Sequence, residues 1–269
     1  MPLRSGFVSI LGRPNAGKST LVNALVGEKV AIVTRKPQTT RNRIHGVLEV
    51  DAVKGKHPAA QIVFVDTPGV HKPTNLLDKR MLQEVYGALE SRDVVLHVVD
   101  VTRRLRFPAT KVQEIEISSA TGPALELPAA QPKVSKPAEH SLENEDTFIL
   151  ELVKKLECPV FLVLNKIDVI DEKETLLPLI AQFSALHNYA EVIPVSARGG
   201  DGLDRLIAKL VEYMPEGRRH FKKGQFTDQP ERFLAAEIIR GKILNLTGEE
   251  VPYASAVVIE KFVKHRLDR

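Results

Sequence analysis

The sequence predicts an α/β fold with a mostly parallel sheet and helices on both of its faces. Two observations predict it. A glycine-rich motif at residues 12–19 stands between an apolar run and a helical pattern, which is the order of strand, turn and helix in a phosphate-binding unit. Short apolar runs then recur along the chain with helical segments between them, as in βαβ units. The expected strands are 7–11, 61–65, 94–101, 160–164 and 192–195.

Periodicity and turn signals place the other elements. The run 45–50 is expected to pair antiparallel with 61–65, because Lys54-Gly55-Lys56 supplies a turn between them. Apolar residues spaced three and four apart predict the helices. These helices are 19–26, 76–90, 147–156, 173–187 and 202–214.

The chain is expected to divide into three parts. Residues 1–216 hold the alternating elements, 217–229 form a linker, and 230–269 supply one helix and one strand at 255–262, too little to bury a core alone. The segment 103–146 carries five prolines and interrupts the alternation, so we expect a disordered insertion there. Within that insertion, 111–118 fits a short strand.

Composition excludes several classes of protein. A single cysteine, Cys158, excludes an internal disulfide. No apolar run approaches the roughly 18 to 20 residues of a membrane span, so we expect a cytosolic protein. The net charge of +4 resides in 217–269, which carry 11 Lys and Arg against 7 Asp and Glu. Basic surface suits nucleic acid or an anionic membrane, and a solvated face is the alternative.

The motif Gly12-Arg-Pro-Asn-Ala-Gly-Lys-Ser19 matches the phosphate-loop pattern GxxxxGK[ST]. Its backbone N–H groups are expected to surround a polyphosphate at a helix N-terminus. Lys18 would reach the β- and γ-phosphates, and the Ser19 hydroxyl would bind Mg²⁺. The other nucleotide contacts expected from this stretch are Gly12, Arg13, Pro14, Asn15, Ala16, Gly17 and Thr20.

A second motif, Asp66-Thr67-Pro68-Gly69, follows the strand at 61–65. A carboxylate there can hold Mg²⁺ through water, and the Gly69 N–H can meet a γ-phosphate. Thr40 lies in the loop before the second strand, from which its hydroxyl can reach Mg²⁺ when the γ-phosphate is bound. The expected Mg²⁺ set is therefore Ser19, Thr40 and Asp66, and the expected nucleotide contacts are Asp66, Thr67, Pro68, Gly69 and Val70.

The base is indicated by Asn165-Lys166-Ile167-Asp168 at the end of a later strand. The Asp168 carboxylate can accept hydrogen bonds from N1–H and the N2 amino group of guanine, and adenine offers neither donor. An unpaired buried acceptor costs about 1–3 kcal/mol, so this residue favours GTP over ATP. We expect contacts from Asn165, Lys166, Asp168, Ser196 and Ala197, with the Ala197 N–H meeting guanine O6.

Taken with Lys36-Pro-Gln-Thr-Thr-Arg41 and Asp228-Gln-Pro-Glu-Arg-Phe233, these motifs resemble the Era family of GTPases. The resemblance implies a Ras-like P-loop GTPase domain followed by an RNA-binding KH domain, here represented by an incomplete KH-like segment without a GxxG loop. It also implies GTP and GDP as ligands, Mg²⁺, 16S rRNA and the small ribosomal subunit as partners, and peripheral contact with the inner membrane.

Hydrolysis is expected to be slow. Val70 stands where Ras-like enzymes often place a water-orienting glutamine, so catalysis would rest on Lys18, Thr40 and Gly69 with help from a partner or an ion. Asn15 resembles the asparagine that holds K⁺ in related GTPases, and a loop-shaping role is the alternative. Two further alternatives stand beside a GTPase switch: a nucleotide-binding scaffold with negligible turnover, or a truncated remnant.

Overall fold

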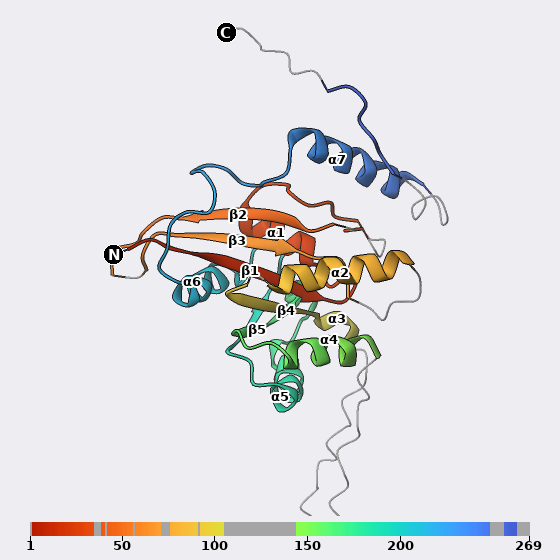
Figure 1. Ribbon diagram of the computed structural model, residues 1–269. Helices are drawn as coiled ribbons and strands as arrows, with labels where there is room; N and C mark the ends of the chain where they lie inside the picture. The colour runs from red at the N-terminus through yellow and green to blue at the C-terminus, as the bar shows by residue number, and fades with distance from the viewer. Residues whose placement is uncertain are drawn as a thin grey trace, which may run out of the picture.

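In the computed structural model, the chain forms a six-stranded sheet with the strand order β2-β3-β1-β4-β5-β6 (Figure 1). Only β2 is antiparallel to its neighbour, as expected for 45–50 and 61–65. The structure describes residues 2–34, 39–40, 42–55, 57–70, 76–90, 92–104, 144–247 and 256–262. The strands are β1 Arg4–Gly12, β2 Ile44–Val50, β3 Ala60–Asp66, β4 Val94–Asp100, β5 Val160–Asn165 and β6 Glu191–Val195.

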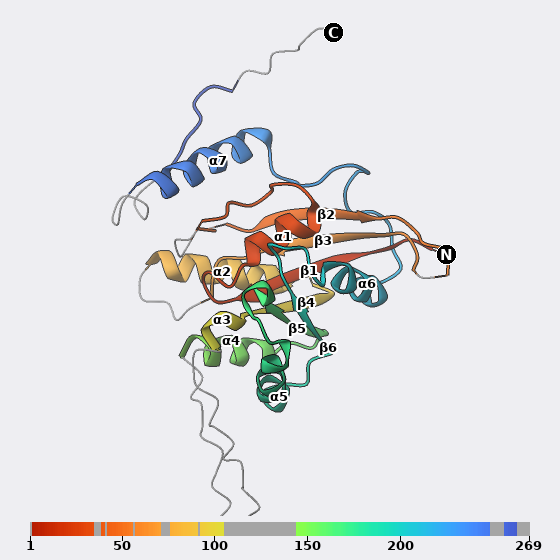
Figure 2. The same cartoon turned by 180° about the vertical axis from the view of Figure 1, so that it is seen from behind.

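Helices cover both faces of the sheet, which confirms the predicted α/β class (Figures 1 and 2). One core packs α1 and α6 against one face, and two further clusters pack α2, α4 and α5 against the other. The helices are α1 Lys18–Val26, α2 Leu76–Glu90, α3 Val101–Arg104, α4 Asn144–Lys154, α5 Leu176–Leu186, α6 Leu203–Tyr213 and α7 Glu231–Leu246, with short 3₁₀ turns at Ile167–Val169 and Lys173–Thr175.

The central strands are apolar at consecutive positions because both of their faces are covered. All residues of β3 and of β5 are buried. A strand buried on both sides loses the alternation of polar and apolar residues. This is why short continuous apolar runs located these strands from the sequence.

The register of the parallel strands brings their carboxyl ends to one edge of the sheet. Ile10 lies opposite Asp66, Gly12 opposite Val98, and Asn165 opposite both Asp100 and Val195. In an open α/β sheet, ligands bind at this edge. The predicted motifs at residues 12–19, 66–69 and 165–168 therefore meet there although they are far apart in the sequence.

The segment 217–229 is docked along the sheet by the side chain of Gln61. Gln61 is fully buried, and its Oε1 accepts hydrogen bonds from the backbone N–H groups of His220 and Phe221, at 2.7 and 2.9 Å. Its Nε2 donates to Glu49 Oε1 and to the Phe221 carbonyl. Farther along, the Val47 N–H donates to the Phe226 carbonyl at 2.8 Å. These hydrogen bonds hold the linker against β2 and β3. The boundaries predicted for the linker stay a prediction.

Two parts of the chain differ from the prediction: the ends of the segment 103–146, and residues 256–262. The helices α3 and α4 extend into both ends of 103–146, and the strand proposed at 111–118 lies outside the described residues. Residues 256–262 form no strand, so that part of the prediction for 255–262 is wrong, because a strand needs a hydrogen-bonded neighbour. No helix in the described parts of the chain is long and apolar enough to cross a membrane.

We expect Gln61→Leu to lower the free energy of unfolding by about 1–3 kcal/mol, because the N–H groups of His220 and Phe221 would lose their acceptor. Urea unfolding measures this change. Gln83→Leu, on the exposed face of α2, is the matched control and should change stability little. Equal effects of the two substitutions would contradict the docking role of Gln61.

Candidate functional site

The turn from β1 into α1 forms a loop that wraps around the end of the sheet. Two residues of this loop have positive φ, Asn15 at 63° and Gly17 at 94°. Asn is among the few side chains that tolerate this region, and Gly adopts it freely. Inside the loop, the Lys18 Nζ donates to the carbonyls of Gly12 and Arg13, both at 3.0 Å. Burial lowers the pKa of Lys18 to about 8, although the negative charge of Asp66 opposes this shift.

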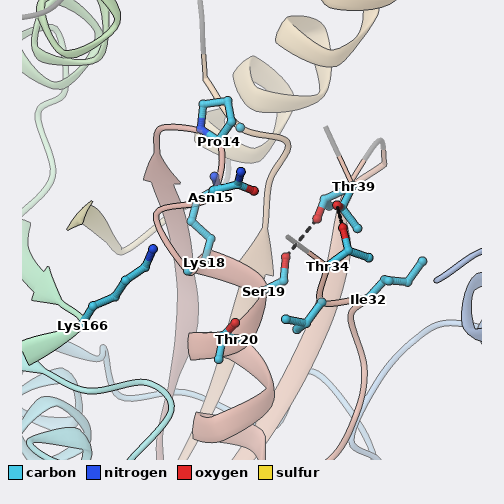
Figure 3. Close-up of a pocket in the computed structure, with 13 residues that line it drawn as sticks. Pro14, Asn15, Lys18, Ser19, Thr20, Ile32, Thr34, Thr39 and Lys166 are labelled. Carbon is cyan, nitrogen blue, oxygen red and sulfur yellow. Dashed lines mark hydrogen bonds between the residues drawn. The ribbon is translucent and has the colours of Figure 1, made fainter. Parts of the chain in front are cut away.

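A cavity of about 290 Å³ lies against this loop (Figure 3). The loop forms one wall, and the segment that follows α1 forms the opposite wall. Because Lys18 faces this space with a buried positive charge, the cavity suits an anion. Its lining residues are Pro14, Asn15, Gly17, Lys18, Ser19, Thr20, Ile32, Val33, Thr34, Thr39, Thr40, Gly69 and Lys166.

Three oxygen-bearing side chains predicted as Mg²⁺ ligands come together beside the cavity. Ser19 Oγ lies 2.9 Å from Thr40 Oγ1 and donates to Asp66 Oδ2 at 2.7 Å, and Thr40 Oγ1 donates to the same oxygen at 3.3 Å. Asp66 is fully buried, and its Oδ1 has no hydrogen-bond partner in the described part of the chain. Such an oxygen set suits Mg²⁺, which binds few protein carboxylates and keeps phosphate and water ligands.

Burial raises the pKa of Asp66 above its ordinary value. Hydrogen bonds from Ser19, Thr40 and the Thr67 backbone, together with the charge of Lys18, offset only part of that effect. A divalent cation at Oδ1 would reverse the balance and favour the carboxylate. No group of three His, Cys, Asp or Glu side chains suited to a metal occurs among the residues that the structure describes. The candidate metal site is the set of Ser19, Thr40 and Asp66, because their oxygen atoms lie close together and Asp66 Oδ1 is buried without a partner among the described residues.

Asn165 links the phosphate loop to the loop after β6. Its Nδ2 donates to the Ala16 carbonyl at 2.9 Å, and its Oδ1 accepts from the Ala197 N–H at 3.0 Å. At Gly17, a Cβ atom would stand 2.2 Å from Asn165 Nδ2, so only glycine fits there. Asn165 thus positions two loops, and its side-chain amide is used within the protein.

The residues predicted to recognise guanine lie beside Asn165. Lys166 lines the cavity, has a φ of 73°, and pairs with Asp100 at 2.5 Å. Asp168 is exposed, and its Oδ1 accepts a hydrogen bond from Ser196 Oγ at 2.7 Å. This bond orients the carboxylate and leaves Oδ2 for a base.

For several residues predicted to contact the nucleotide, the side chain makes its contacts within the protein. The Arg13 guanidinium pairs with the buried Asp146 of α4 at 3.2 Å. The hydroxyl of Thr67 donates to the Ile10 carbonyl at 2.5 Å, and Pro68 is buried. None of these three residues lines the cavity. Ile32, Val33, Thr34 and Thr39 also line the cavity and were not among the predicted contacts. Ile32, Val33 and Thr34 lie outside the motifs, and Thr39 lies in the motif at residues 36–41, where only Thr40 was assigned a role.

The side chain of Val70 lies in the core, and a contact of this residue with the nucleotide stays a prediction. Val70 is 1% exposed and packs with Leu11, Val85 and Leu89 in the core between the sheet and the helices. Its N–H donates to the Gly12 carbonyl at 3.1 Å. The residue after Gly69 therefore faces the interior, because an apolar side chain at this position gains free energy by leaving the polar site.

We expect Val70→Gln to destabilise the protein without faster GTP turnover, because its amide would be buried in an apolar core. The unpaired amide costs about 1–3 kcal/mol, measured by urea unfolding. Val53→Gln, at a position 41% exposed, is the control. Normal stability together with faster phosphate release from Val70→Gln would contradict the inward orientation.

Comparisons with known proteins agree with this geometry. Residues 7–166 match the family described as 50S ribosome-binding GTPase. GTPase Era of Geotalea uraniireducens is 41% identical over 265 residues, covering 98% of this chain and 74% of that protein. GTPase Era of Staphylococcus epidermidis is 37% identical over 266 residues, covering 99% and 74%.

Solved structures give the same result. A crystal structure of Era in complex with MgGDPNP and nucleotides 1506–1542 of 16S ribosomal RNA aligns with a TM-score of 0.72 and 35% identity, over 93% of this chain and 70% of that one. Aquifex aeolicus Era in a GDP·AlF₄⁻ complex aligns with the same values. The fold is thus a Ras-like P-loop GTPase, and the scaffold and remnant alternatives are not favoured. By its motifs, its site and its relatives, this chain belongs to the Era family of GTPases and is a guanine-nucleotide switch that hydrolyses GTP.

Proposed function

We propose that this chain binds Mg²⁺-GTP in the cavity between the phosphate loop and the segment after α1. The observation that carries this proposal is the meeting of Ser19, Thr40 and Asp66 beside the buried Lys18. In this assignment Lys18 binds the β- and γ-phosphates, while Ser19, Thr40 and Asp66 hold Mg²⁺. Bound Mg²⁺ supplies positive charge next to the phosphates.

The two mobile contacts of the switch would be Thr40 and Gly69. Thr40 lies in a loop, and its hydroxyl donates to Asp66 Oδ2. The Gly69 backbone lies against Pro14 of the phosphate loop. A γ-phosphate would be held from both sides by these contacts, and its loss would release them. Hydrolysis needs little covalent chemistry from the protein, so Lys18 and backbone donors act by positioning and charge stabilisation.

Because the Val70 side chain is apolar and buried in the core, an ion or a partner would complete the charge stabilisation. Asn15 is the candidate K⁺ ligand, since it lines the cavity on the strained turn of the loop. We expect GTP turnover to be faster in KCl than in NaCl at equal ionic strength, and Asn15→Ala to remove that difference. Phosphate release measures both. Equal rates in the two salts would eliminate the K⁺ assignment and favour a loop-shaping Asn15.

Guanine selectivity would come from Asp168, oriented by Ser196 and free at its second oxygen to accept from the base. We expect Asp168→Asn to weaken GDP binding by roughly 1–3 kcal/mol, because the amide places a donor against guanine donors. The same variant should gain affinity for xanthine nucleotides, whose oxygen at that position accepts. Asp171→Asn, also exposed, is the matched control. Unchanged guanine affinity in Asp168→Asn would place the base elsewhere; calorimetry measures both affinities.

A partner of this switch is proposed to be 16S rRNA, within the small ribosomal subunit. Its support is the Era structure solved with nucleotides 1506–1542 and the basic excess of residues 217–269. Fluorescence anisotropy with that RNA, against a scrambled RNA of equal length, tests the proposal. Equal affinity for both would indicate binding to phosphates alone. From the family resemblance we also propose a cytoplasmic location with peripheral contact to the inner membrane.

A further inference from the structure

Arg240 is a buried cation on α7 that reaches out of its own helix. Its side chain is 5% exposed. The guanidinium binds the carboxylate of Glu237 through two hydrogen bonds, from Nε at 2.8 Å and from Nη2 at 2.7 Å. The same Nη2 donates to the Thr39 carbonyl at 2.7 Å. The planar guanidinium group of Arg240 therefore joins α7 to the backbone of Thr39, the residue before Thr40.

A second contact on the same turn of α7 holds the other end of that segment. A Cβ atom at Gly241 would stand 2.7 Å from Ile32 Cγ2, so the helix backbone lies directly against Ile32. Both Ile32 and Thr39 line the cavity. Figures 1 and 2, which view the molecule from opposite sides, both show α7 next to the coil that follows α1. The helix thus contacts the cavity wall at its start and near its end.

The buried ion pair of Arg240 and Glu237 is a weak source of stability for packing a helix. Burying an ion pair costs desolvation that apolar packing avoids. In addition, Arg240 Nη1 is buried and finds no acceptor in the part of the chain that the structure describes. What the guanidinium does supply, and an apolar side chain cannot, is a directed donor to the Thr39 carbonyl.

We propose that Arg240 is a positioning residue for the GTP state. Through the Thr39 carbonyl it holds the next residue, Thr40, with its hydroxyl 2.9 Å from Ser19 Oγ and 3.3 Å from Asp66 Oδ2. The position of α7 and the binding of Mg²⁺-GTP are then coupled. The inference rests on the proposed function in which Thr40 holds Mg²⁺.

The coupling has a defined sign. Thr40 contributes to the site only when the γ-phosphate and Mg²⁺ are both present, so releasing it penalises GTP and leaves GDP unaffected. Because coupling between two sites is reciprocal, Mg²⁺-GTP must stabilise the docked position of α7 by the same factor. A ligand that binds two states equally would shift nothing.

The test uses the full chain with Arg240→Met, which keeps the length of the side chain and removes the guanidinium group. We expect its affinity for the Mg²⁺ complex of GDPNP, a GTP analogue, to fall about tenfold, while its affinity for Mg²⁺-GDP changes less than about twofold. Arg232→Met is the matched control on the exposed side of α7 and should change neither affinity. Arg240→Lys keeps the charge without the planar guanidinium group and should recover only part of the loss.

A double-mutant cycle with Thr40→Val separates this role from a structural one. If Arg240 acts through Thr40, the two losses of GDPNP affinity are not additive, and Arg240→Met adds little to Thr40→Val. Additive losses, equal losses for GDPNP and GDP, or no loss would overturn the proposal. Failure of the underlying function has a different signature: GDPNP would bind the wild-type chain equally well with Mg²⁺ and with EDTA.

Hydrogen exchange on the wild-type chain decides the case if Arg240→Met does not fold. We expect Mg²⁺-GDPNP to slow amide exchange in Glu231–Leu246 relative to Mg²⁺-GDP. The amides of α5, Leu176–Leu186, serve as the internal control and should exchange equally in both complexes. Equal exchange of α7 in both complexes would overturn the coupling.

Discussion

The nucleotide site depends on the side chain of Asn165. This side chain is 1% exposed and satisfies a carbonyl of the phosphate loop and an N–H of the loop after β6 at the same time. Removing it would leave two buried backbone groups without partners, each at a cost of about 1–3 kcal/mol. The phosphate loop and the loop after β6 are therefore joined by the hydrogen bonds of one side chain. Asp168 follows Asn165 by three positions in the sequence.

The polar groups around Lys18 are arranged for a ligand more than for the protein alone. Burial lowers the pKa of Lys18 and raises that of Asp66, and the attraction between the two charges offsets only part of each shift. A polyphosphate with a divalent cation supplies both counter-charges together. This physical complementarity agrees with membership of the Era family, and it explains why the site needs few specialised catalytic side chains.

The helix α7 contacts the segment after α1 that lines the cavity. The helix presents Arg240, Gly241 and Leu244 as its buried face, and Gly241 allows the close approach to Ile32. Ile238 and Ile239 remain 45% and 46% exposed on the same helix. One side of α7 therefore contacts the cavity wall, while apolar side chains elsewhere on the helix are exposed.

The sequence by itself determined the sheet, most helix boundaries and the residues of the phosphate, metal and base motifs. It did so because buried parallel strands have continuous apolar runs, and because the chemistry of phosphates, Mg²⁺ and guanine demands particular side chains at fixed spacings. Only the tertiary structure decided which way a motif residue points: Val70 faces the core, and Arg13 pairs with Asp146 of α4. It also decided that Arg240, about 200 positions away along the chain, binds the Thr39 carbonyl. Such contacts join residues distant in sequence through backbone atoms, which every residue carries and no sequence pattern marks.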